Sequence, residues 1–156
     1  MLSLTTKEKF LLEDEKKEEQ LCIEKYTKYA QRASDPQLKN LFNQIAQCEQ
    51  QHLNSINQIL SGTVPTLNQG QNQNNQQAQN DMPNINLGNT TTLNEVDKML
   101  CQDCLSTEKY VSSTYNTAIF EFKDKNVRQV LNHIQKEEQE HGEKLYNYMS
   151  QHNMYN

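Results

Sequence analysis

Glycine and proline, which interrupt helices, are scarce in most of this chain. The 156 residues contain four glycines, three prolines and no tryptophan, and three of the glycines and two of the prolines fall within residues 61–92. No apolar run is long enough to cross a bilayer, so membrane insertion is not expected. The opening MLSLTTKEKF reaches charged side chains at once, and no signal peptide is predicted.

Basic charge is also in short supply. Lysine and arginine number 15 against 20 acidic residues, and the net charge of −5 argues against nucleic acid as a partner. Hydrophobic residues make up only 34% of the chain, and the mean hydropathy is −0.97. Such a lean core suits long amphipathic helices that each bury one stripe. Strand-type alternation is missing, so the composition and pattern predict an all-α fold.

Residues 61–92 differ from the rest of the chain. They hold eight asparagines and six glutamines, with Asp81 as the one charged side chain. A tract of this composition cannot bury enough apolar surface to fold by itself. We therefore expect a flexible linker between two folded segments, 1–60 and 93–156.

The two segments are copies of each other. A shift of 89 positions aligns them without a gap, and the identical pairs include charged and aromatic residues at helical spacing. These pairs are Glu19 and Glu108, Tyr26 and Tyr115, Asp35 and Asp124, Glu49 and Glu138, and His52 and His141. The sequence therefore predicts one structural unit repeated twice.

Each copy is predicted to form two helices. Thr5 with Glu8, and Asn94 with Asp97, have the spacing of a capping box at the start of the first helix. The second helix starts at Asp35-Pro36, with aspartate as N-cap and proline in the first turn. The inward stripes of the two first helices are Leu12, Glu19, Cys22, Ile23, Tyr26 and Ala30, and Val96, Leu100, Glu108, Val111, Tyr115 and Ile119. The stripes of the two second helices are Leu38, Leu41, Phe42, Ile45, Glu49, His52, Ile56 and Leu60, and Val127, Val130, Leu131, Ile134, Glu138, His141, Leu145 and Met149.

Two such hairpins are expected to pack as one four-helix bundle. If the second and third helices run parallel, the linker must cross on the order of 40 Å, and a coil of its length reaches that far. A long linker also leaves open which hairpin pairs with which, so a homo-oligomer or a domain-swapped dimer is feasible.

Acids and imidazoles interrupt the apolar stripes. The residues concerned are Glu19, Glu49, His52, Glu108, Glu138 and His141. Unpaired charges cost several kcal/mol each when buried, and four carboxylates at one level of a bundle would repel one another. One Glu from each of two helices, with Glu-x-x-His from each of the other two, is the di-iron or di-manganese arrangement of ferritin-like bundles. The sequence therefore predicts these six residues as ligands of two iron or manganese ions.

Two interpretations of this cluster stay open at this point. Besides binding metal, the residues can be the remnant of a duplicated site that now forms a hydrogen-bonded polar layer. Tyr26 and Tyr115 lie two turns from Glu19 and Glu108 on the same face, either as donors to the ligands or as core aromatics. Whether Glu15 or Asp103 adds to the ligands is also open.

The cysteines give no zinc or thioredoxin-like pattern. Cys101 and Cys104 form one C-x-x-C without a second pair or a nearby histidine. We expect small, half-buried helical thiols, with oxidative cross-linking as the alternative. Cys22 and Cys48 flank the predicted metal face and are interpreted in the same way.

A family resemblance follows from the order of short motifs. Residues 105–156 contain EKY, YNTAIFE, NVRQVL, EEQEH and the ending YMSQHNMYN, and they resemble the coat F family of spore coat proteins. The first copy, from LLEDEKKEEQ to QLKNLF, is similar to the N-terminal half of clostridial-type members. The resemblance implies a ferritin-like fold and a structural spore coat component. Such a component is made in the mother-cell cytoplasm, deposited on the forespore and partnered by other coat proteins.

The complete set of six ligands also resembles rubrerythrin-like and ferritin-like di-metal proteins. An alternative function is therefore a di-metal redox enzyme, peroxidase-like or manganese catalase-like, that handles peroxide. No rubredoxin-like cysteine module is present in the sequence, so an electron-transfer partner would be another protein. The sequence does not decide whether the protein is an enzyme.

Overall fold

Four long helices make up the structure, a computed structural model that describes residues 1–67 and 94–155. They are α1 (Thr6–Arg32), α2 (Pro36–Leu60), α3 (Glu95–Glu121) and α4 (Lys125–Gln151). The predicted linker over 61–92 lies outside the described residues from position 68 onward. The all-α prediction is confirmed, and none of the described helices is long and apolar enough to span a membrane.

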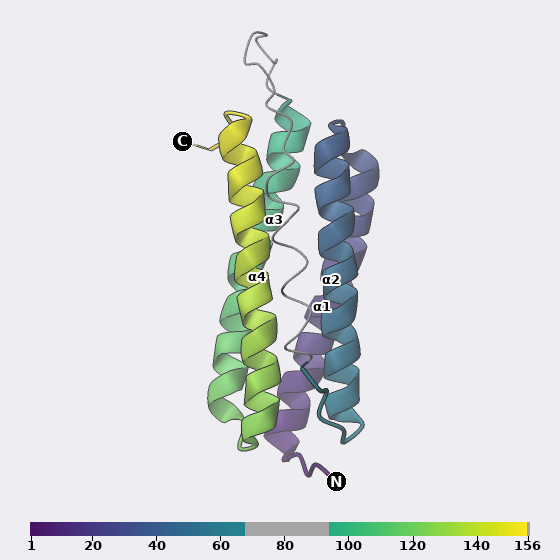
Figure 1. The fold of residues 1–156 in the computed structure, drawn as a ribbon, viewed down its shortest axis with the longest axis vertical. Coiled ribbons are helices and arrows are strands. Elements are labelled where there is room, and N and C mark those ends of the chain that lie inside the picture. The colour runs from purple at the N-terminus through teal and green to yellow at the C-terminus, as the bar shows by residue number, and fades with distance from the viewer. Residues whose placement is uncertain (68–93, 156) are drawn as a thin grey trace.

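The helices pack as two hairpins that form one bundle (Figure 1). Within the hairpins α1 packs on α2 and α3 on α4, and between them α1 packs on α3 and α2 on α4. In Figure 1, α2 ends near the bottom of the bundle and α3 begins near the top, so these two helices run parallel. The end of α2 at Leu60 and the start of α3 at Glu95 therefore lie at opposite ends of the bundle.

The helix starts follow the predicted capping chemistry. Thr5 Oγ1 accepts from the Glu8 backbone at 3.2 Å, and the Glu8 carboxylate accepts from the Thr5 backbone at 2.7 Å. Asp35 caps α2 with Pro36 in the first turn, and Asp124 caps α4 at the equivalent position of the second copy. These caps satisfy backbone N–H groups that a helix end leaves without partners.

The start of α3 departs from the predicted capping box. Asn94 accepts from the Asp97 backbone at 3.0 Å, but the Asp97 carboxylate accepts from the backbone of Ser34 (2.8 Å) and of the next residue (3.1 Å). Glu8 makes the equivalent contact, accepting from the Lys123 backbone at 2.9 Å. An acid at the start of each hairpin thus caps the turn of the other hairpin, and these contacts interlock the two copies.

The core follows the predicted stripes with a few corrections. Val96 was expected to face inward but is 41% exposed, because Asp97 next to it is the buried side chain of that turn. Ile59 and Tyr148 are buried although neither was expected in a stripe. Leu41, Leu60, Ile23 and Ile119 are only partly buried.

The C-x-x-C pair lies deeper than predicted. Cys101 and Cys104 are fully buried rather than half-buried, and all four cysteines of the chain are free thiols. Burial raises the pKa of the Cys101 thiol to about 12 and raises that of Cys104 as well. Thiols with so little thiolate character pack as small hydrophobic side chains.

Candidate metal centre

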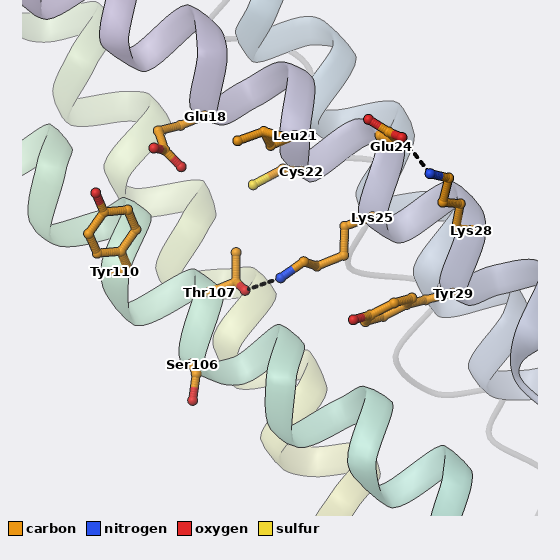
Figure 2. Close-up of a pocket in the computed structure, with 10 residues that line it drawn as sticks. All are labelled: Glu18, Leu21, Cys22, Glu24, Lys25, Lys28, Tyr29, Ser106, Thr107 and Tyr110. Atoms are coloured by element: carbon orange, nitrogen blue, oxygen red, sulfur yellow. Dashed lines mark hydrogen bonds and ion pairs between the residues drawn. The ribbon is translucent and has the colours of Figure 1, made fainter.

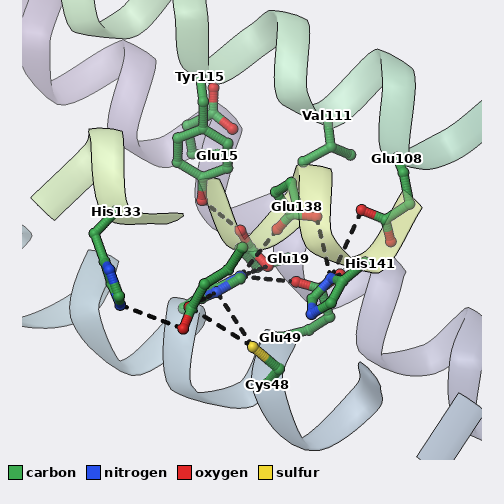
Figure 3. Close-up of polar contacts among 12 residues, drawn as sticks. Glu15, Glu19, Cys48, Glu49, Glu108, Val111, Tyr115, His133, Glu138 and His141 are labelled. Carbon is green, nitrogen blue, oxygen red and sulfur yellow. Dashed lines mark hydrogen bonds and ion pairs between the residues drawn. The ribbon is translucent and has the colours of Figure 1, made fainter. Parts of the chain in front are cut away.

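The six residues singled out in the sequence come together inside the bundle, and Figure 3 labels all of them except His52. Each helix contributes through its inward stripe, and every one of the six side chains is at most 3% exposed. They are Glu19 on α1, Glu49 and His52 on α2, Glu108 on α3, and Glu138 and His141 on α4. The structure therefore brings together residues as far apart as 19 and 141.

Three carboxylates surround the inner nitrogen of His52 and form the first group of four with it. Its Nδ1 lies 2.9 Å from Glu49 Oε2 and 2.9 Å from Glu138 Oε1. Glu19 Oε2 lies 3.7 Å from the same nitrogen. Three helices thus supply ligand atoms around one point.

Three carboxylates likewise surround the inner nitrogen of His141 and form the second group of four with it. Its Nδ1 lies 3.5 Å from Glu49 Oε1, 3.6 Å from Glu138 Oε2 and 3.7 Å from Glu108 Oε2. Glu49 and Glu138 belong to both groups and offer a different oxygen to each. The arrangement is that of two adjacent cation positions with two bridging carboxylates, and each position draws on both hairpins.

The hydrogen bonding of the cluster is incomplete. Within the described part of the chain, five buried side-chain atoms have no hydrogen-bond partner, and all five belong to this cluster. They are Glu19 Oε2, Glu49 Oε1, Glu108 Oε2, Glu138 Oε2 and His141 Nδ1. Burying such groups without partners costs about 1–3 kcal/mol each. Ligand atoms about 2.0–2.2 Å from a metal ion stand roughly 3–3.5 Å apart, close to the spacing around His141 Nδ1. The residues present therefore fit a pair of cations.

Without cations, protons must offset the buried negative charge. Burial raises the pKa of Glu108 to about 8 and moves the pKa of Glu19 well above its usual range. Burial also opposes the charged form of both imidazoles, but the neighbouring Cys48 and the surrounding carboxylates raise their pKa well above normal. Because metal ligands must be deprotonated, cations binding here would displace protons.

The two tyrosines hydrogen-bond to carboxylates of the opposite hairpin. Tyr26 donates to Glu108 Oε1, and Tyr115 donates to Glu19 Oε1. Both rings are fully buried. The sequence placed each tyrosine near the glutamate of its own helix, whereas the structure pairs it with the glutamate of the other copy. Each of these glutamates then has one oxygen held by a tyrosine and one directed into the cluster.

Two further acids, left open as ligands by the sequence, have different surroundings. Glu15 is 3% exposed and accepts from Thr114 Oγ1 at 3.0 Å, and its burial raises its pKa to about 8. Asp103 lies away from the centre, with its carboxylate bound to Tyr29 (2.7 Å) and Lys25 (2.9 Å). Glu15 is thus a neighbour of the centre and Asp103 is not.

Sequence reasoning missed Glu137. Its Oε2 lies 2.6 Å from His52 Nε2, on the side of the ring that faces away from the cluster. The signal was present, because residue 137 is 89 positions after Cys48, which was expected to flank the metal face. Its Oε1 lies 3.3 Å from His133 Nε2.

One groove on the surface lies away from the candidate centre. It runs between α1 and α3 with a volume of about 620 Å³, and Leu21, Cys22, Tyr29 and Tyr110 are among its lining residues (Figure 2). Lys25 crosses the groove, with its Nζ 2.9 Å from Thr107 Oγ1. None of the six candidate ligands lines this groove.

Comparison with known protein families gives a match to the second hairpin. The Coat F domain matches residues 96–156, which cover nearly all of α3 and all of α4. Residues 96–156 belong to the Coat F domain family. No curated protein and no solved structure matches the chain. In this Coat F domain protein, the Coat F segment supplies Glu108, Glu138 and His141, half of the candidate ligands.

Proposed function

We propose that this Coat F domain protein is a structural component of the bacterial spore coat whose bundle holds two divalent cations. The Coat F match over residues 96–156 supports the coat assignment. The matched segment is also the one that resembles spore coat proteins in its motifs. On this proposal the protein is made in the mother-cell cytoplasm, moves to the forespore surface and contacts other coat proteins there.

The observation that supports the cations is the set of five buried atoms without partners. Glu19 and His52 would hold one ion, Glu108 and His141 the other, and Glu49 and Glu138 would contact both. Carboxylate and imidazole ligands suit both iron and manganese. When bound, such ions would supply positive charge to the core and one-electron redox chemistry. The protein's own part is to orient the ligands, through Tyr26 and Tyr115 among others, and to exclude water.

Metal analysis of protein purified without chelators tests the cation site. We expect about two iron or manganese ions per chain in the parent, as in other bundles with this ligand set, and their loss in a Glu49→Gln, Glu138→Gln variant. The matched control exchanges one exposed acid in each hairpin, Glu24→Gln and Glu140→Gln, and should keep the metal. A parent without metal, and a variant at least as stable, would leave the cluster as a hydrogen-bonded polar layer.

Location is tested separately. Antibody labelling of sectioned sporulating cells and extraction of coats from purified spores should find the protein in the coat. Its confinement to the mother-cell cytoplasm, with none in mature spores, would contradict the coat assignment while leaving the metal site untouched.

A second candidate function is peroxide turnover at the same cluster. The observation that favours it is the contact of two buried, oxidisable tyrosines, Tyr26 and Tyr115, with candidate ligands. Metal-loaded protein should then consume hydrogen peroxide, and the Glu49→Gln, Glu138→Gln variant should not. Loaded protein that leaves peroxide unchanged would exclude this activity, and the coat proposal would stand without it.

Self-association belongs to the same proposal. The end of α2 and the start of α3 lie at opposite ends of the bundle, and the length of chain between them would also let the second hairpin pack on the first hairpin of another copy. Sedimentation should then detect a dimer whose hairpins are exchanged. A strictly monomeric protein at all concentrations would contradict the exchange.

A further inference from the structure

The outer side of the His52 ring faces a second set of ligand atoms. Nε2 of this imidazole lies 2.6 Å from Glu137 Oε2 and 3.5 Å from Cys48 Sγ. The thiol and the carboxylate are themselves 3.7 Å apart. A sulfur, a nitrogen and an oxygen from α2 and α4 thus converge on one point outside the buried cluster.

We propose that Cys48, His52 and Glu137 form an outer cation site, selective for a borderline-soft divalent ion such as Zn²⁺. The proposal does not rest on the function of the buried cluster. His52 is the one residue shared between the two, and it offers Nδ1 inward and Nε2 outward. With the buried positions empty, the ring can bind the outer ion through Nε2 and keep its proton on Nδ1; with both sides filled, it would lose both N–H protons and bridge the ions as an imidazolate.

The spacing of the three atoms is close to that of a tetrahedral ion. Zinc lies about 2.3 Å from sulfur and about 2.0–2.2 Å from nitrogen or oxygen, which puts tetrahedral ligands roughly 3.3–3.6 Å apart. The distances from Cys48 Sγ, 3.5 and 3.7 Å, already match this spacing. The short one, from His52 Nε2 to Glu137 Oε2 at 2.6 Å, is a hydrogen bond that an ion would replace. The Glu137 side chain is 25% exposed, on the side of the cluster that meets solvent.

The donor types separate the outer site from the buried one. Thiolate and imidazole together favour zinc-like ions, whereas a cluster dominated by carboxylates suits iron or manganese. Three protein ligands leave a fourth position for water, as in open zinc sites. Cys48 is only partly buried, so an ion can reach the outer site from solvent.

The internal repeat gives this site once and not twice. Cys48 and Glu137 occupy equivalent positions in the two copies, 89 residues apart. The copies keep all six buried ligands in identical pairs but differ at this pair, where one copy has a thiol and the other a carboxylate. The buried site is duplicated with the repeat, and the outer site arises where the repeat diverges.

Cobalt binding tests the proposal, because a thiolate ligand gives Co²⁺ a charge-transfer band in the near ultraviolet that oxygen and nitrogen ligands do not. Reduced full-length protein titrated with Co²⁺ should develop this band, and stoichiometric Zn²⁺ should remove it. Cys48→Ser should abolish the band. Cys22→Ser, at a fully buried thiol near the cluster, should keep it and serves as the matched control.

A second pair of variants separates the two sites. The Glu49→Gln, Glu138→Gln protein should retain the thiolate band while losing the buried ions, and Glu137→Gln should weaken the band at limiting Co²⁺. Circular dichroism melts of each variant check that the helices are intact. Absence of the band in the folded parent, or its persistence in Cys48→Ser, would overturn the outer site and leave Glu137 as a hydrogen-bond partner of His52 only.

Discussion

The hydroxyl of Tyr26, on the first hairpin, donates a buried hydrogen bond to the carboxylate of Glu108 on the second. This bond holds one oxygen of a candidate ligand and leaves the other directed into the cluster. The equivalent residues of the internal repeat make the reciprocal hydrogen bond, in which Tyr115 donates to Glu19. The two tyrosines therefore link the bundle's interface directly to its centre.

Tyr26→Phe should destabilise the metal-free protein by about 1–3 kcal/mol, because it leaves a buried carboxylate oxygen of Glu108 without a donor. Urea unfolding in the presence of a chelator measures the change. Tyr29→Phe is the matched control, since its hydroxyl contacts Asp103, whose side chain is 44% exposed. Equal unfolding midpoints for the two variants would show that the buried hydrogen bond stabilises the protein no more than the exposed one.

Glu15 should make the metal-free protein less stable as pH rises. Its pKa is raised from 4.5 to about 8 in the folded state, so the folded protein keeps a proton that the unfolded chain releases. Stability should therefore fall between these two pH values and change little from this group above or below them. Glu15→Gln keeps an acceptor for Thr114 and removes the ionisation.

The Glu15→Gln variant should match the parent near the lower end of that range and exceed it above the upper end. The difference should be on the order of a few kcal/mol, because a tenfold change in proton affinity is worth about 1.4 kcal/mol. Thermal unfolding of chelated protein across the range measures it. A constant difference at all pH values would contradict the assignment to Glu15.

Asp97→Ala should cost about 1–3 kcal/mol, because its carboxylate accepts from two backbone N–H groups in the turn of the other hairpin. Denaturant unfolding measures the loss, and hydrogen exchange should show faster exchange at Ser34 and Asp35. Glu95→Ala, at an exposed position two residues earlier on the same helix, is the control. Unchanged protection at Ser34 would mean that the interlock carries no stability.

Gly142→Ala should stabilise the protein by up to about 1 kcal/mol, since glycine inside a helix is unfavourable relative to alanine. A Cβ added there meets Leu105 Cδ1 at 3.8 Å, an ordinary contact. Gly62→Ala provides the contrast, because that residue has φ +90°, where a side chain is strained. Thermal midpoints should move in opposite directions, and a lower midpoint for Gly142→Ala would show crowding beside His141.

The helices and the inward acids were predictable because each depends on local spacing. Glu-x-x-His places two candidate ligands on one side of a helix, and the repeat at 89 positions brought both pairs into register. Asp35-Pro36 marked a helix start for the same local reason. Features that depend on residue spacing within one helix can therefore be predicted from the sequence.

Contacts between the hairpins were not predictable in this way. Tyr26 was placed beside Glu19 but bonds to Glu108, and Asp97 leaves its own N-cap for the backbone of Ser34. Glu137 was missed because its partner, His52, lies on another helix of the other copy. Each of these depends on how two equivalent hairpins meet, and a one-dimensional pattern does not specify that.

Neither hairpin owns a complete candidate position, since both groups of four take residues from residues 1–67 and from residues 94–155. Division of the chain between these segments would leave two fragments with three ligands each. Cations bound at these positions would then join two separate fragments, and association of the fragments would depend on the concentration of free metal. A chelator would then weaken the association of the two fragments.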